Sequence, residues 1–225
     1  PHYLFSQEKH SDGDRTLSWD PLFKEHLRVK ESRKDIYNKL IKPFIKEDMN
    51  VLDFGCGPGY LSYFSSNDCR KVIGTDISRG VLECARIINE RENISYIHGT
   101  KDELPDFQKG TFDLIFSFAV FQHIRDDYLE NILLHLNRML KDKGKLICNI
   151  PLASSEIKSS ILNENIEENL FLRRLRIPMY YREFEDVKVL FRRCNFTLDN
   201  YFLCSDKFEL DDDIEHYHVF HFSKK

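Results

Sequence analysis

The sequence predicts a doubly wound α/β fold in a chain of 225 residues, a length that can bury one sizeable core. Short apolar runs that are typical of strands alternate with helical patterns as far as residue 150. Such alternation is typical of a parallel sheet covered by helices on both faces. Near the C-terminus two β-like runs follow each other, which favours an antiparallel pair. We therefore expect a mixed, mostly parallel sheet.

The N-terminal region is expected to contain an arm and one helix. The first twenty residues are polar and predicted to be irregular. From Leu22 to about Phe44, apolar side chains fall at helical spacing, and Pro43 closes or kinks this helix. The first strand of the sheet is predicted over 50–54, directly before three closely spaced glycines.

Three further strands are predicted at 71–76, 94–98 and 112–117. Ser78 is a good N-cap for a helix that runs to about Glu90, between the first two of these strands. The run 112–117 is almost continuously apolar, as expected for a strand with helices on both sides.

The next helix is expected to begin at Asp126 or Asp127 and to end at Gly144, before a strand over 145–150. Residues 151–180 are rich in Ser, Glu, Asn and Arg and are predicted to lie outside the sheet.

The last part of the chain predicts a helix near 184–194 and two β-like runs, at 196–204 and 216–222. The acidic residues 211–213 lie between these runs, so we expect the runs to pair as a hairpin.

Composition and charge narrow the functional classes. The chain has 33 Lys and Arg against 37 Asp and Glu, a net charge of -4 and a pI near 6.2, so no strong positive field favours non-specific nucleic-acid binding. No apolar run approaches the roughly 18 residues that a membrane span needs, and no secretory signal is visible. The six cysteines form no C-x-x-C pair and are interpreted as reduced core residues, so we expect a cytoplasmic protein.

The most informative segment is VLDFGCGPGY, which begins at Val51 and carries Gly55, Gly57 and Gly59. Glycine permits positive φ and close approach of a ligand to the backbone, and open α/β sheets bind ligands at the carboxyl ends of their strands. The dinucleotide motif G-x-G-x-x-G does not fit, because the third glycine comes one residue early. Asp53 would repel a pyrophosphate and is better suited to a positively charged ligand, such as S-adenosylmethionine.

A second carboxylate, Asp76, ends the second predicted strand and can accept hydrogen bonds from both hydroxyls of a ribose. Proteins that bind NAD share this feature, so Asp76 alone does not identify the ligand. The loop 98–105 after the third strand is a candidate for contact with an adenine edge.

Five successive motifs resemble those of class I S-adenosylmethionine-dependent methyltransferases: VLDFGCGPGY, VIGTDIS, IHGTKDELP, FDLIFSFAVFQHI and LNRMLKDKGKLICNIP. The nearest type is the small-molecule (type 11-like) branch, and the resemblance covers about residues 34–150. It implies a Rossmann-like methyltransferase fold with seven strands, of which the last is antiparallel. We expect one domain over 1–225, with an N-terminal arm and helix (1–45), a cofactor-binding core (46–150), a substrate lid or insert (151–182) and a C-terminal helix and hairpin (183–225).

The resemblance implies S-adenosyl-L-methionine as cofactor. Its methionine half would lie along the glycine segment, its ribose on Asp76 and its adenine on Ile77. Thr100 stands where family members often carry Asp, so its hydroxyl or the backbone near Lys101 would serve the adenine. Backbone groups after the fourth strand would border the methyl group. The residues expected to bind the cofactor are Asp53, Gly55, Cys56, Gly57, Gly59, Tyr60, Asp76, Ile77, Thr100, Lys101, Ser117 and Phe118.

His123 is the candidate general base because an imidazole titrates near neutral pH. Its alternative role is packing under the cofactor. Arg176, Tyr180 and Tyr181 are candidate substrate contacts, although a solvated helix face also explains the basic cluster around Arg176.

Arg28 or Arg33 could pair with the carboxylate of the cofactor, and surface charge is the alternative. The alternating residues His216, His218 and His221 lack partner acids at ligand spacing, so no metal site is predicted.

We therefore expect methyl transfer to an oxygen or nitrogen of a small-molecule acceptor, such as a metabolite, sugar or natural product. The sequence lacks the [DN]-P-P-[YF] loop of amino-purine methylation, the Pro-Cys nucleophile of pyrimidine methylation and the paired-Glu loop of arginine methylation. Two alternatives stay open. One is an RNA or protein methyltransferase that uses 151–182 for recognition, and the other is a cofactor-binding module without catalysis. Neither a membrane nor a nucleic acid is an expected partner.

Overall fold

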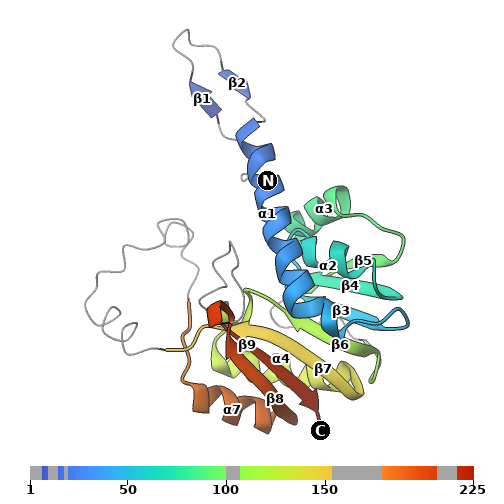
Figure 1. Cartoon of the computed structure of the whole chain (residues 1–225), viewed down its shortest axis with the longest axis vertical. Coiled ribbons are helices and arrows are strands. Elements are labelled where there is room, and N and C mark those ends of the chain that lie inside the picture. The colour runs from blue at the N-terminus through green and yellow to red at the C-terminus, as the bar shows by residue number, and fades with distance from the viewer. Residues whose placement is uncertain (1–6, 10–14, 18–19, 100–106, 154–178, 207–216) are drawn as a thin grey trace, which may run out of the picture.

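The computed structural model describes residues 7–9, 15–17, 20–99, 107–153, 179–206 and 217–225. A seven-stranded sheet forms its centre (Figure 1). In spatial order the strands are β5 (Ile94–His98), β4 (Lys71–Asp76), β3 (Asn50–Phe54), β6 (Phe112–Ser117), β7 (Leu140–Ile150), β9 (His218–Lys224) and β8 (Phe196–Leu203).

The pairing of the strands confirms the predicted fold class. The five strands from β5 to β7 are parallel to one another, and β9 runs antiparallel to both β7 and β8. The strand order reverses beside β3, because β4 lies on one side of it and β6 on the other. A ligand cleft is expected at such a switch point.

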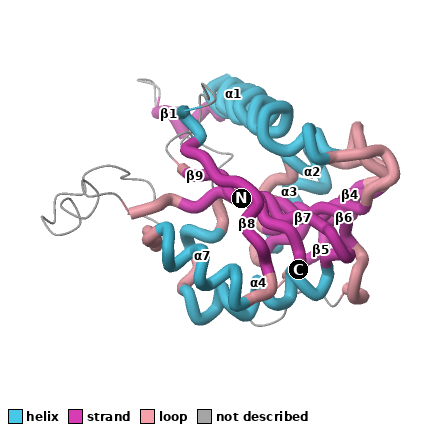
Figure 2. The backbone as a smooth tube through the Cα atoms, turned by 60° about the horizontal axis from the view of Figure 1, so that its bottom comes forward, coloured by secondary structure: helices cyan, strands magenta, loops and turns pink. Residues whose placement is uncertain are grey.

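Helices cover both faces of the sheet. Figure 2 shows α1 (Asp20–Ile36) and α2 (Tyr60–Ser65) on one face, and α4 (Asp126–Met139) and α7 (Phe184–Arg193) on the other. A further helix, α3 (Arg79–Ile88), joins β4 to β5, and Ser78 caps it by accepting a hydrogen bond from the amide of Val81. None of the helices in the described part of the chain is long and apolar enough to cross a membrane.

Two apolar cores follow from this layering. Along β6, Leu114 and Phe116 are buried against the α1 side, whereas Ile115 is buried against the α4 side. This alternation explains the continuously apolar strand in the sequence. Near the C-terminus the core is largely aromatic, and the rings of Phe191 and Phe222 stack 4.1 Å apart.

The N-terminal helix ends near Pro43 as predicted, but its last turns are not α-helical. A π-helical turn, η2 (Tyr37–Ile41), and a 3-10 turn, η3 (Lys42–Phe44), follow α1. A proline cannot donate to the carbonyl four residues earlier and its ring crowds it, so the α-helical pattern changes before Pro43.

The prediction of an irregular N-terminal arm was wrong for two short stretches. β1 (Gln7–Lys9) and β2 (Arg15–Leu17) pair as an antiparallel hairpin beyond the outer end of α1 (Figure 1). Each strand has three residues, which is too short for a period of two to be visible in the sequence.

The predicted bounds of the helix after β6 also need correction. Arg125 occupies the N-cap position without a capping side chain, and Asp126 and Asp127 lie in the first turn of α4. Their charges there complement the positive end of the helix dipole.

Gly144 does not end α4, because it lies within β7. Leu140 already pairs with Phe112, and the register then shifts before Lys145 pairs with Leu114. This irregularity places Lys143 at a φ of +65°. The charged residues between Leu140 and Lys145 resemble a turn in sequence but form a bulged strand.

Candidate functional site

The three glycines after β3 all have positive φ, at +76°, +52° and +80° for Gly55, Gly57 and Gly59. A Cβ on Gly55 would lie 2.3 Å from Cγ2 of Val120, and one on Gly59 would lie 2.3 Å from Oη of Tyr96. A Cβ on Gly57 would meet no atom of the described residues within 4 Å. Gly55 and Gly59 therefore allow close packing, whereas Gly57 borders open space.

The backbone amides of this loop are bound to the end of β4. The amides of Gly55 and Cys56 both donate to the carbonyl of Thr75, at 2.8 and 2.9 Å. The amide of Gly57 donates to Oδ2 of Asp76 at 3.0 Å. These donors are consequently engaged within the protein, unlike the amides of a phosphate-binding loop.

The Asp76 carboxylate is held from two sides. Its Oδ2 accepts from Gly57, and its Oδ1 accepts from the amide of Ser78 at 2.8 Å. A carboxylate has about four acceptor positions, so two directions remain for further donors.

The second carboxylate, Asp53, is 2% exposed and accepts a hydrogen bond from Oγ of Ser62 at 2.6 Å. Burial raises the pKa of Asp53 to about 7, the Ser62 hydroxyl opposes this shift, and the charge of Asp76 adds to it. Near neutral pH this carboxyl is therefore poised between its neutral and charged forms.

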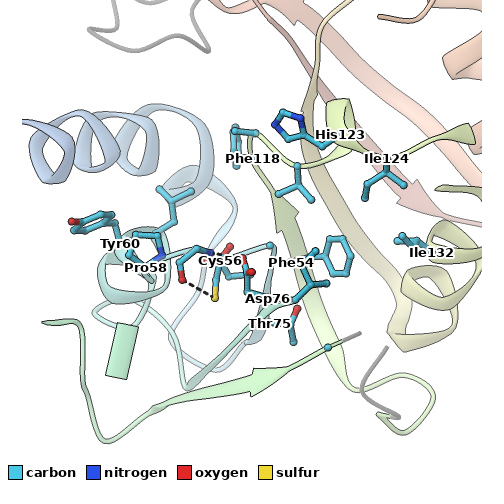
Figure 3. Close-up of a pocket in the computed structure, with 18 of the residues that line it drawn as sticks. Phe54, Cys56, Pro58, Tyr60, Thr75, Asp76, Phe118, His123, Ile124 and Ile132 are labelled. Carbon is cyan, nitrogen blue, oxygen red and sulfur yellow. Dashed lines mark hydrogen bonds between the residues drawn. The ribbon is translucent and has the colours of Figure 1, made fainter. Parts of the chain in front are cut away.

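Both carboxylates border a cavity of about 860 Å³ at the carboxyl ends of β3, β4 and β6. In Figure 3, Tyr60 and Pro58 lie on one side of it, and Phe118 and His123 lie on another. An apolar wall from the segment after β6 and from α4 completes the cavity: Phe118, Ala119, Val120, Ile124, Tyr128 and Ile132. The cavity thus combines an acidic, glycine-lined end with a large apolar surface.

The chain is similar to known methyltransferases. A family model described as a methyltransferase domain (type 11) matches residues 52–148. An uncharacterised protein of Methanocaldococcus jannaschii is 30% identical over 179 residues, which are 79% of this chain and 72% of that protein. The chain belongs to the class I S-adenosylmethionine-dependent methyltransferases.

Characterised relatives of this methyltransferase share shorter stretches with it. A malonyl-[acyl-carrier protein] O-methyltransferase of Priestia megaterium is 29% identical over 135 residues, which are 56% of this chain and 48% of that one. A ribosomal protein L11 methyltransferase of Burkholderia lata is 36% identical over 72 residues, which are 32% of this chain and 23% of that one. The chain thus spans about half the length of these named enzymes or less.

A solved structure confirms the fold of this methyltransferase. The magnesium protoporphyrin IX methyltransferase of Synechocystis PCC 6803, with bound SAH, matches with a TM-score of 0.63 and 15% identity. The match covers 95% of this chain and 90% of that one.

The methyltransferase fold brings most of the residues predicted for the site to one cavity. Those that line it are Asp53, Gly55, Cys56, Gly57, Tyr60, Asp76, Ile77, Phe118, His123 and Tyr180. Arg33 lines it as well, whereas Arg28 is not part of the described wall.

Three predicted residues do not belong to the described cavity wall: Gly59, Ser117 and Tyr181. Gly59 is the N-cap of α2 and packs against Tyr96. Ser117 is buried, and its hydroxyl donates to the carbonyl of Phe54 at 2.9 Å.

Some residues predicted for the site lie outside the described part of the chain. They are Thr100, Lys101 and Arg176, and most of the predicted lid, 151–182, lies outside it as well. His216 also lies outside them, and the alternation along β9 places His218 and His221 on opposite faces of the sheet. Within the described residues, no group of three or more His, Cys, Asp or Glu could hold a metal ion.

Sequence reasoning missed most of the apolar wall of the site. Ile124, Tyr128 and Ile132 line the cavity at intervals of four residues, which places them on one side of α4 and the turn before it. This spacing was visible in the sequence. Its meaning depended on knowing that α4 begins beside the carboxyl end of β6.

Proposed function

We propose that this protein transfers a methyl group from S-adenosyl-L-methionine to an oxygen or nitrogen of a small-molecule acceptor. The observation that carries the proposal is the chemistry of the cavity. The amides of Gly55, Cys56 and Gly57 are engaged by β4, and the carboxyls of Asp53 and Asp76 line the cavity instead. Such a site suits a ligand with positive charge and hydroxyl donors better than a pyrophosphate.

The residues of the cavity fit the parts of this cofactor. The free acceptor directions of Asp76 would take the ribose hydroxyls. Ile77 is 69% exposed at the rim of the cavity, although it is a large apolar residue, and would pack on the adenine. Asp53 would face the cationic groups, and Arg33 would pair with the carboxylate of the methionine part.

The bound cofactor supplies a methyl group that is already activated on a sulfonium, so the protein mainly has to align the acceptor. His123 lines the cavity near Phe118 (Figure 3). Tyr180 lines it as well, and its amide donates to the carbonyl of Gln122, next to His123, so we assign the acceptor to this side. His123 would remove the acceptor proton and pass it to solvent. Tyr180 would contact the acceptor through its ring or hydroxyl.

A small acceptor is favoured by three observations. The chain has a net charge of -4, the cavity has a large apolar wall, and a related enzyme is an O-methyltransferase. The relative named for ribosomal protein L11 favours protein as the alternative acceptor. The six cysteines are all free thiols, and five of them are buried, which supports the predicted cytoplasmic location.

Two measurements test the proposal. Calorimetric titration should show that SAH, the demethylated product of the cofactor, binds with micromolar affinity and that NAD does not compete. Wild-type protein should then release SAH from S-adenosylmethionine in the presence of a metabolite fraction, and not with RNA or protein extract. Preference for NAD would overturn the cofactor assignment, and SAH release with protein extract alone would overturn the acceptor class.

A further inference from the structure

A buried arginine behind the cavity holds one of its walls. Arg182 is 5% exposed. Burying a guanidinium costs free energy unless its N–H groups donate hydrogen bonds. The acceptors of these hydrogen bonds therefore indicate which part of the structure Arg182 stabilises.

Two of the three side-chain partners of Arg182 lie in the segment that joins β6 to α4, and the third is the first residue of α4. Its Nη1 donates to the carbonyl of Phe121 at 2.9 Å, and its Nη2 donates to the carbonyl of Ile124. Its Nε donates to Oδ1 of Asp126 at 2.7 Å, but the Asp126 side chain is 66% exposed. Since an exposed carboxylate gives a weak ion pair, the two carbonyls are the more significant partners.

The backbone of Arg182 is itself fixed to the chain that leaves β7. Arg182 forms a parallel bridge with Leu152, and its carbonyl accepts from the amide of Ala153 at 2.9 Å. Two residues earlier, the amide of Tyr180 donates to the carbonyl of Gln122 at 2.7 Å. The backbone that carries the guanidinium is therefore held in place by the residues that follow β7.

The segment that Arg182 holds forms a large part of the cavity wall. It contains the turn η4 (Phe121–His123), and His123, Ile124 and Arg125 all line the cavity. Arg182 itself does not line the cavity as far as the described residues define it.

We propose that Arg182 is a positioning residue that fixes the segment 121–126 as one wall of the cavity, so that Ile124 and Arg125 keep the cavity in the shape that binds the cofactor and His123 faces the acceptor. This inference rests on the proposed function, because the ligand of the cavity is taken from it. A guanidinium can serve three acceptors in fixed directions, whereas the single nitrogen of a lysine cannot serve all three at this geometry.

Three variants test this role: Arg182→Met, Arg182→Lys and, as control, Arg193→Met. Arg193 also connects two helices, since its guanidinium pairs with Glu130 of α4 at 3.0 Å, but its side chain is 63% exposed. The readouts are the dissociation constant for SAH, at a temperature where each variant is fully folded, and hydrogen exchange of peptides that cover residues 118–128.

Arg182→Met should weaken SAH binding about tenfold and speed exchange at 121–126 at least tenfold, with little change in the sheet. For Arg182→Lys, the SAH affinity and the exchange rate at 121–126 should both lie between those of Arg182→Met and wild type. For Arg193→Met, both should stay within twofold of the wild-type values. A merely structural role would lower the melting temperature but leave the folded protein with wild-type affinity and with exchange raised evenly over the chain.

That even pattern, or wild-type affinity in Arg182→Met, would overturn the inference. If Arg182→Met does not fold, Arg182→Lys decides by the same two readouts. If wild-type protein does not bind SAH, the proposed function fails, and the exchange experiment still decides whether Arg182 fixes the segment.

Discussion

Replacing Gly57 by alanine should impair ligand binding much more than folding, and replacing Gly59 should do the reverse. Both glycines have positive φ, at +52° and +80°. They differ in their surroundings, because a Cβ on Gly57 borders the cavity whereas one on Gly59 would lie 2.3 Å from Oη of Tyr96.

The magnitudes follow from these contacts. An alanine with left-handed φ costs roughly 1–2 kcal/mol, and the reduced entropy of the unfolded chain offsets part of this, so Gly57→Ala should cost about 1 kcal/mol. Gly59→Ala adds an overpacking cost of about 1–3 kcal/mol, because Tyr96 must move and its hydroxyl donates to the carbonyl of Asn89 at 2.9 Å. At about 2–4 °C per kcal/mol, the melting temperature should fall by about 2–4 °C for Gly57→Ala, and the combined cost of about 2–4 kcal/mol should lower it by about 4–16 °C for Gly59→Ala.

Thermal unfolding and SAH calorimetry on the same samples give the comparison. At a temperature where both variants are folded, Gly57→Ala should weaken SAH binding more than tenfold, because its methyl group enters the cavity beside Asp76. Gly59→Ala should bind SAH within about threefold of wild type. The opposite order of affinities would refute the view that the ligand approaches the backbone at Gly57.

Four further predictions concern three polar residues of the cavity. Asp76→Ala should weaken SAH binding more than tenfold by calorimetry, and an unchanged affinity would contradict the ribose assignment. S-adenosylmethionine should bind more tightly as the pH rises through about 7, where Asp53 becomes charged, and Asp53→Asn should remove this dependence. Without ligand, the pKa of the Asp53 carboxyl is 3.8 in the unfolded chain and about 7 in the folded protein. The stability of the wild type relative to Asp53→Asn should therefore fall as the pH rises from about 3.8 to about 7, as thermal melts would show. His123→Ala should lower turnover about 100-fold or more with nearly unchanged SAH affinity, and turnover that survives with the true acceptor would show that His123 is not the base.

Four strands of the parallel core, β3 to β6, could be predicted to the residue because their signals are local. Each is a short apolar run ended by a glycine or a polar residue, as at Phe112–Ser117. The errors arose where tertiary contacts override local pattern. The residues around Gly144 continue a strand because Lys141 pairs with Asp113 at 2.7 Å and Lys224 donates to the carbonyl of Leu140 at 2.7 Å. Neither partner is close in sequence.

The acidic end of the candidate site was predictable for the same reason. Asp53 and Asp76 lie at the carboxyl ends of β3 and β4, and Gly57 lies three residues after β3. The distinct roles of the glycines were not predictable, because Val120 and Tyr96 come from other strands and loops. Arg182 carried no local signal either. Its three partners lie 56 to 61 residues away in sequence, and only the fold brings Arg182 to the stretch from η4 to the start of α4.

The electrostatics of the cavity favour a cationic ligand independently of any resemblance. Asp53 and Asp76 both border it, and the charge of Asp76 disfavours the charged form of Asp53. Two backbone amides hold Asp76, whereas Asp53 has the Ser62 hydroxyl and a pKa raised to about 7 by burial. A cation at the glycine end would favour the charged form of Asp53 and release a proton on binding. An anionic pyrophosphate would instead keep Asp53 neutral and meet the fixed charge of Asp76. Proton release on binding, measured by calorimetry in buffers of different ionisation enthalpy, thus distinguishes the two ligand classes.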